Sequence, residues 1–135
     1  MHSKPRFFIA LVSTITVFNL AWLVACSGQG SNSPAKAAQA YLSALVEKNA
    51  NTLSNLSCAD WEPQAILEMD SLAAVKVSLK GVNCQENKAE GGFTLVSCTG
   101  AIIADYNGEI LEIQLSERIF KMANEKGEWR MCGYK

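Results

Sequence analysis

Hydrophobic and polar positions divide the chain into three parts. Residues 7–25 carry no charged side chain. From Pro34 onward, apolar residues recur every three or four positions, which is the spacing of one helix face. From Ala73 onward they alternate with polar residues, which is the period of a half-buried strand. This order predicts an apolar N-terminal segment, then helices, then a sheet.

Two or three helices are predicted between residues 34 and 72. Ser33-Pro34 predicts the first start, because serine caps helices and proline suits their first position. This helix should reach about Lys48, and a short second one should follow Asn49. The apolar positions at helical spacing are Ala37, Ala38, Tyr41, Leu42, Leu45 and Val46, then Leu53 and Leu56, then Ala65, Ile66 and Met69.

Four strands are predicted after the helices. The first begins near Ala73, residues 86–92 are expected to form a loop, and residues 93–106 form the next strand. Asn107-Gly108 predicts a type I′ hairpin, since both central residues of that turn need positive φ. The turn sets the register, with the expected pairs Tyr106–Glu109, Ala104–Leu111 and Ile102–Ile113.

The strand after this turn should change faces. Ile102, Ala104, Leu111, Ile113 and Leu115 share one face, but further along the apolar positions shift to Phe120 and Met122. A bulge near Glu117-Arg118 is therefore expected to bend the strand. The chain then turns again at residues 124–127 into a last strand over residues 129–134.

The N-terminal segment resembles a bacterial lipoprotein signal. Lys4 and Arg6 precede the uncharged run, and Leu23-Val24-Ala25-Cys26 is similar to a lipobox. In that family the Cys26 sulfur receives a diacylglycerol, a peptidase cuts before it, and the new amino terminus is acylated, for example with palmitate. The alternatives are a transmembrane helix with an ordinary cysteine and a plain secretory signal.

This resemblance implies three segments. Residues 1–25 are a signal peptide, 26–33 are a lipidated N-terminus with a flexible tether, and 34–135 are one domain. Two acyl chains or more make a stable anchor, so the protein is expected at the extracytoplasmic face of a bacterial membrane. The tether, fully extended, spans ~24 Å.

Charge and histidine content exclude several classes of function. Removal of the signal leaves 10 basic and 13 acidic residues, a formal net charge of −3, without the basic stripe of a nucleic-acid binder. The single histidine, His2, leaves with the signal. Histidine-dependent catalysis and histidine-bearing metal sites are thereby excluded. No metal or cofactor is expected.

Cys58, Cys84, Cys98 and Cys132 remain, an even number in an exported chain. None forms a C-x-x-C motif, so two disulfides are expected rather than a zinc site. Four cysteines allow three connectivities, of which Cys84–Cys98 with Cys58–Cys132 is favoured. In the chain-entropy model these bridges contribute ~3 and roughly 4 kcal/mol.

The domain resembles the cystatin-like, nuclear-transport-factor-like superfamily, in particular its small bacterial lipoproteins of unknown function. The resemblance lies in residues 38–45 of the first helix, in the closing hairpin with Gly127-Glu128-Trp129-Arg130, and in helices followed by a meander. It implies an α+β cone, in which two or three N-terminal helices pack on a curved four-stranded antiparallel meander. Some members hold a ligand pocket in the cone.

Isomerases and dehydratases of this superfamily use a buried aspartate base with tyrosine or acid donors. The candidates by residue type are Asp60, Asp70, Tyr41 and Tyr106, the pair Glu117-Arg118, and the aromatic residues Trp61, Trp129 and Tyr134. Structural roles are preferred for all of them, with Asp60 expected to cap the third helix. No catalytic residue is therefore assigned.

The function predicted from the sequence is a non-enzymatic, lipid-anchored binding or interaction module. Its expected contacts are the membrane, through Cys26, and an unidentified protein partner or small ligand. A small enzyme of the isomerase or dehydratase type is the alternative. An enclosed pocket with an unpaired carboxylate would favour the enzyme, and a cone filled by Ile102, Ile113, Leu115 and Trp61 would favour the module.

Overall fold

The computed structural model describes residues 33–135, which form three helices, five strands and one 3-10 turn. The elements are α1 (Pro34–Val46), α2 (Ala50–Asn55), α3 (Glu62–Ser71), β1 (Lys76–Glu90), β2 (Phe93–Tyr106), β3 (Glu109–Gln114), η1 (Leu115–Glu117), β4 (Ile119–Glu125) and β5 (Glu128–Tyr134). The α+β class is confirmed. The predicted signal peptide, Cys26 and the tether lie outside the described residues. None of the helices in residues 33–135 has the length and apolar character needed to span a bilayer.

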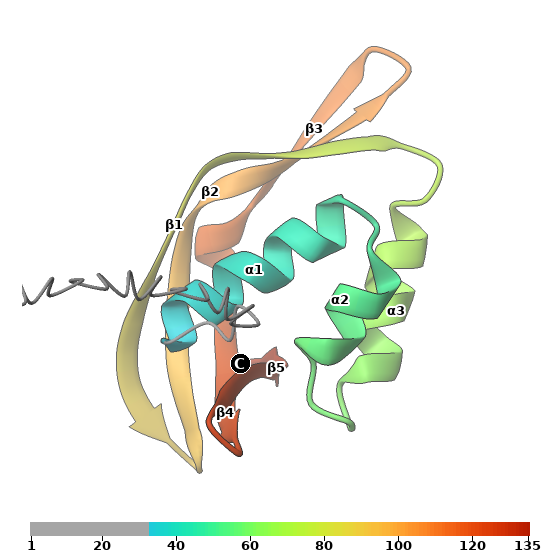
Figure 1. Cartoon of the computed structure of the whole chain (residues 1–135). Coiled ribbons are helices and arrows are strands. Elements are labelled where there is room, and N and C mark those ends of the chain that lie inside the picture. Colours follow the sequence, from blue (N-terminus) through green and yellow to red (C-terminus); the bar gives the residue numbers. More distant parts are fainter. Residues whose placement is uncertain (1–32) are drawn as a thin grey trace, which may run out of the picture.

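The sheet is antiparallel and curved, and α1 lies across its concave face, with α2 and α3 beyond the C-terminal end of α1 (Figure 1). Strand order is β1-β2-β4-β5, with β3 paired to β2. β3 and β4 follow one another along one edge of β2, because β3 pairs with residues 101–106 and β4 with residues 94–97.

The prediction of four strands was wrong by one, because η1 divides the predicted third strand. The expected bulge near Glu117-Arg118 is this 3-10 turn, in which Leu115 is buried. Burying Leu115 turns the backbone away from the pleat of β3, and the alternation resumes in β4 with Phe120 and Met122 buried.

The ends of the helices follow local chemistry. Ser33 caps α1 as predicted, its Oγ accepting a hydrogen bond of 3.2 Å from the Lys36 N–H. α1 ends at Val46 rather than Lys48, which adopts a positive φ of 57°. The Lys48 ammonium donates to the carbonyls of Ala73 and Val75, so the lysine links the helix end to the chain just before β1.

Asp60 does not cap α3, contrary to the prediction. Trp61 occupies the cap position and makes no side-chain cap hydrogen bond. Instead, the N–H groups of Trp61 and Glu62 both donate to the Cys58 carbonyl. A backbone turn therefore precedes the helix, and Asp60 is left exposed to solvent.

The predicted hairpin register is confirmed. Tyr106 pairs with Glu109, Ala104 with Leu111, and Ile102 with Ile113. The turn residues Asn107 and Gly108 have φ values of 56° and 99°. The Gly108 N–H donates to Asp105 Oδ1 at 2.6 Å, which further fixes the turn.

Residues 86–92 were predicted as a loop, but β1 continues through Glu90 and turns at Gly91-Gly92. β1 is an edge strand of the sheet. Its polar side chains lie exposed in this part, so they need not alternate with apolar ones. Backbone pairing with β2 holds it, with one register shift between Glu86 and Ala89.

A second register shift bends the sheet. Lys80 pairs with Ala101 and Asn83 with Thr99, so Gly81 and Val82 together lie opposite Gly100. A Cβ added to Gly100 would lie 2.5 Å from the Lys80 carbonyl oxygen. Glycine is therefore required where the bulged strand crosses its neighbour, and the bulge curves β1 and β2 around α1.

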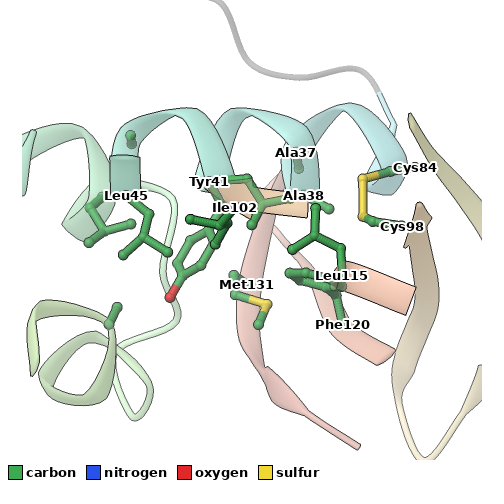
Figure 2. Close-up of a cluster of buried hydrophobic side chains, with 14 of the residues drawn as sticks. Ala37, Ala38, Tyr41, Leu45, Cys84, Cys98, Ile102, Leu115, Phe120 and Met131 are labelled. Carbon is green, nitrogen blue, oxygen red and sulfur yellow. A yellow bond between two sulfur atoms is a disulfide. The ribbon is translucent and has the colours of Figure 1, made fainter. Parts of the chain in front are cut away.

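The space between α1 and the sheet is filled by side chains (Figure 2). Residues at most 3% exposed in this core include Ala37, Ala38, Tyr41, Leu42, Leu45, Ile102, Leu115, Phe120, Met122 and Met131. Ile113 and Trp61 pack against it while partly exposed. The four residues predicted to fill the cone thus all belong to its packed interior or border it.

Two disulfides join the pairs favoured from the sequence. Cys84–Cys98 connects directly opposed residues of β1 and β2 and lies beneath α1 (Figure 2). Cys58–Cys132 connects the segment between α2 and α3 to β5, 74 positions apart. Beside it, Ser57 forms a parallel bridge with Met131, so this segment lies along β5.

Candidate functional site

A polar cluster centred on Glu68 lies where the helices meet the end of the sheet. The Tyr41 and Tyr134 hydroxyls donate to Glu68 Oε2 at 3.2 and 3.1 Å. An Arg118 guanidinium nitrogen lies 3.6 Å from Glu68 Oε1. Trp61 Nε1 donates to the Tyr41 hydroxyl oxygen at 3.1 Å. We call these five residues the Glu68 cluster.

Four separate parts of the chain supply this cluster, because Trp61 occupies the cap position of α3 and Glu68 lies within it. Tyr41 comes from α1 and Glu68 from α3, whereas Tyr134 is the last residue of β5. Arg118 directly follows η1, so the 3-10 turn places its guanidinium 5.0 Å from the centre of the Tyr134 ring. Trp61 meets the same ring edge-on at 5.3 Å. These contacts hold the aromatic rings in fixed orientations.

Burial raises the pKa of both phenols. Desolvation raises the pKa of Tyr41, and the neighbouring Tyr134 and Glu68 raise it further. Desolvation also raises the pKa of Tyr134. The charge of Glu68 raises it further, and Arg118 lowers it. Both hydroxyls therefore remain protonated donors at neutral pH. The Glu68 side chain is 20% exposed and that of Arg118 is 38% exposed.

A carboxylate beside two tyrosines is a set of groups that proton-transfer enzymes use. Here, however, the carboxylate of Glu68 accepts two hydrogen bonds and faces a guanidinium. A general base must be free to reach a substrate proton. The arrangement serves to connect α1, α3 and β5 around Arg118.

The structure brings together only some of the candidates named from the sequence. Tyr41, Trp61, Arg118 and Tyr134 meet in the Glu68 cluster. The remaining candidates lie elsewhere: Asp60 and Asp70 are exposed near the two ends of α3, Glu117 is exposed in η1, Tyr106 is exposed in the β2–β3 hairpin, and Trp129 is partly buried in β5.

Sequence reasoning missed Glu68, the residue that joins the cluster. Glu68 lies three positions after Ala65 and four before Leu72, both of which are buried. An acidic residue in this apolar stripe was the available signal, since helix positions three and four apart share a face. Its partners come from distant parts of the chain, so the helical spacing within α3 could not have identified them.

The Cys58–Cys132 disulfide borders a surface depression of about 270 Å³ that Asp60, Phe93 and Glu125 also line. Donor atoms of Cys58, Cys132 and Glu125 lie within 4.8 Å of one another. Because the two sulfurs are bonded to each other, they do not offer the thiolates that zinc requires.

Exposed apolar side chains gather on the β2–β3 hairpin, which projects beyond the helices (Figure 1). We call residues 101–114 the arm. Its Tyr106, Ile110 and Leu111 are 45%, 55% and 49% exposed. Among residues 33–135 the remaining large exposed hydrophobic residue is Leu67, on α3.

Comparison with known proteins establishes no family for the chain. The sequence matches no protein-family model and no curated protein. Among solved structures, the fold is similar to the crystal structure of a protein from Streptomyces avermitilis that is named a putative dehydratase from the NTF2-like family. The match has 17% identity and a TM-score of 0.47, and it covers 71% of this chain and 86% of that chain. Because identity and TM-score are both so low, the activity in that name does not extend to this chain.

Proposed function

We propose that the protein is a lipid-anchored bacterial lipoprotein whose extracytoplasmic domain is a non-enzymatic binding module with a cystatin-like cone fold. The observation that carries the binding role is the contrast between a filled interior and an apolar arm. Core residues such as Leu42 and Leu115 occupy the cone, whereas Ile110 and Leu111 lie exposed on the arm. Leu111 lies diagonally across from Tyr106 on one face of the arm, and Ile110 projects from the other face, so each face carries exposed apolar surface of the kind that can mark an interaction site.

The anchor is inferred from the lipobox-like sequence ending at Cys26. Two disulfides in the domain support this location, because disulfides persist in oxidising compartments outside the cytoplasm. We expect Cys26→Ser to prevent lipidation. The membrane fraction of the host should then lose the protein, and its mass should change from the lipidated to the unlipidated value. A Cys26→Ser chain that stays in the membrane at an unchanged mass would exclude the lipid anchor.

The binding role is tested on the arm. Cross-linking in intact cells should join the native chain to a partner, and Ile110→Ser with Leu111→Ser should reduce that product severalfold. Leu67→Ser is the matched control, because Leu67 is more exposed than either residue but lies on α3. Equal loss of the product in both variants would contradict a binding site on the arm.

A small enzyme of the isomerase or dehydratase type remains the second candidate, because Glu68 contacts two tyrosine hydroxyls. Such an enzyme would exchange a proton next to a carbonyl group with solvent deuterium. Exchange that Glu68→Gln abolishes, and that Glu62→Gln on the exposed side of α3 leaves intact, would favour the enzyme. Partner binding without exchange favours the module.

A further inference from the structure

We propose that the outer edge of β3 binds an extended segment of a partner protein in which basic and apolar residues alternate. This inference rests on the proposed binding function and specifies the chemistry of the partner. The segment would add one strand to the sheet, so that main-chain hydrogen bonds supply affinity and side chains supply specificity.

The backbone of β3 offers an unpaired edge. In a two-residue hairpin the closing pair, Tyr106–Glu109, is hydrogen-bonded, and bonded and non-bonded pairs alternate from there. Ile110, Glu112 and Gln114 therefore direct their N–H and C=O groups away from β2. Within residues 33–135, β3 pairs with β2 alone.

The other two edges of the sheet are protected. β1 carries Lys76, Lys80 and Lys88 and has two register shifts, which are features that discourage strand addition. Along β5, the Cys58 N–H donates to the Met131 carbonyl, and the Met131 N–H donates to the Leu56 carbonyl. β3 has neither lysine nor proline, and its pairing with β2 is regular. Within residues 33–135, no segment is hydrogen-bonded to its outer edge as residues 56–58 are to β5.

Side chains of β3 specify an alternating partner. Leu111 and Ile113 lie on the face shared with the buried residues Ala104 and Ile102. Glu112 lies on the opposite face, where Lys80 reaches its Oε1 at 2.9 Å. An added strand would therefore place apolar side chains beside Leu111 and Ile113 and its other side chains beside Ile110, Glu112 and Gln114.

Charge complementarity makes those other side chains basic. Residues 101–117 contain four acidic side chains, Asp105, Glu109, Glu112 and Glu117, and no basic one. Of the four, Glu112 alone lies in β3 on the face of those side chains, and Lys80 already pairs with it, so the net negative charge of the arm as a whole supplies the attraction. A second copy of the chain would bring the same acidic arm, and like charges on adjacent strands are destabilising. A basic segment is attracted instead.

The test uses a capped eight-residue peptide of alternating valine and lysine, titrated into the full-length ¹⁵N-labelled chain in detergent micelles. Binding should slow hydrogen exchange at the amides of Ile110, Glu112 and Gln114. Amides of Leu111 and Ile113 already bond to β2 and should change less. A valine–glutamate peptide of the same length should not bind, and added salt should weaken the valine–lysine complex.

Ile110→Pro removes one outward N–H and should weaken peptide binding by about tenfold, the equivalent of one hydrogen bond. Edge positions tolerate proline, and unchanged spectra elsewhere verify the fold. Glu112→Gln, which keeps every backbone group, should reduce the salt dependence of binding and leave the amide protection pattern unchanged. Binding that is absent, unaffected by Ile110→Pro, or centred outside β3 would overturn the proposal.

If hydrogen exchange at the same amides slows as the protein concentration rises, without peptide, then the β3 edge mediates self-association and the proposed partner is wrong. Partner cross-linking that survives in the Ile110→Pro chain would overturn the β3 edge as the docking site and leave the binding function standing. If the native chain forms no cross-linked product with a partner, the binding function itself is wrong.

Discussion

Glu68 is the half-buried acidic residue of α3, while Glu62 and Asp70 on the same helix are exposed. Its carboxylate satisfies two buried phenols that would otherwise lack an acceptor, and a buried donor without an acceptor costs roughly 1–3 kcal/mol. These hydrogen bonds therefore stabilise the fold. Sequence spacing places Glu68 on the buried face, but its partners follow only from the tertiary fold.

The Tyr41 phenol should make stability depend on alkaline pH. Its folded-state pKa is raised above the ordinary value of about 10. This stabilising contribution is complete below pH ~10 and is lost as pH rises further, because the unfolded chain releases a proton that the folded chain keeps. The slope is up to about 1.4 kcal/mol per pH unit for each such group.

Urea unfolding of the native chain and of Tyr41→Phe between pH 9 and 11 measures this contribution. The free energy of unfolding should fall more steeply with pH in the native chain, and lysine titration cancels in the comparison. If the free energy of unfolding falls equally with pH in the two proteins, then burial does not raise the pKa of Tyr41.

Among the elements, the β1–β2 pair depends most on a single residue. Gly100→Ala should destabilise the fold by about 2–4 kcal/mol, since the new methyl group meets the Lys80 carbonyl and φ is +92°. Gly92→Ala is the matched control, with a φ of +85° and nothing within 4 Å of the added Cβ. Urea denaturation of both variants isolates the cost of the close approach. Equal losses would show that strand curvature does not require Gly100.

Elements with local determinants could be predicted from the sequence. Ser33-Pro34 sets the start of α1, and Asn107-Gly108 sets the hairpin register, because each acts over a few residues. The sequence did not predict that residues 86–90 form a strand, because an exposed edge strand needs no alternation of apolar and polar residues. The break at η1 depends on burying Leu115, which only the packed core decides.

The whole molecule is held by a small core and two bridges. Cys58–Cys132 closes a long loop, and in the chain-entropy model it contributes roughly 4 kcal/mol. Cys58→Ser with Cys132→Ser should lower the free energy of unfolding by that amount. The same variant should also increase the urea m-value, because the unfolded chain becomes less compact. Urea denaturation measures both quantities, and unchanged values would show that the bridge contributes nothing.

The Cys58–Cys132 bridge also determines what happens to the fragments if a protease cuts the arm. The turn at Asn107-Gly108 is exposed at the tip of the arm, and exposed loop tips are preferred sites of proteolysis. A cut there would leave the C-terminal fragment covalently attached through Cys132 to the fragment that contains Cys58. If Cys26 carries lipid, a protease alone would not release the C-terminal fragment from the cell surface, and release would also require a reductant.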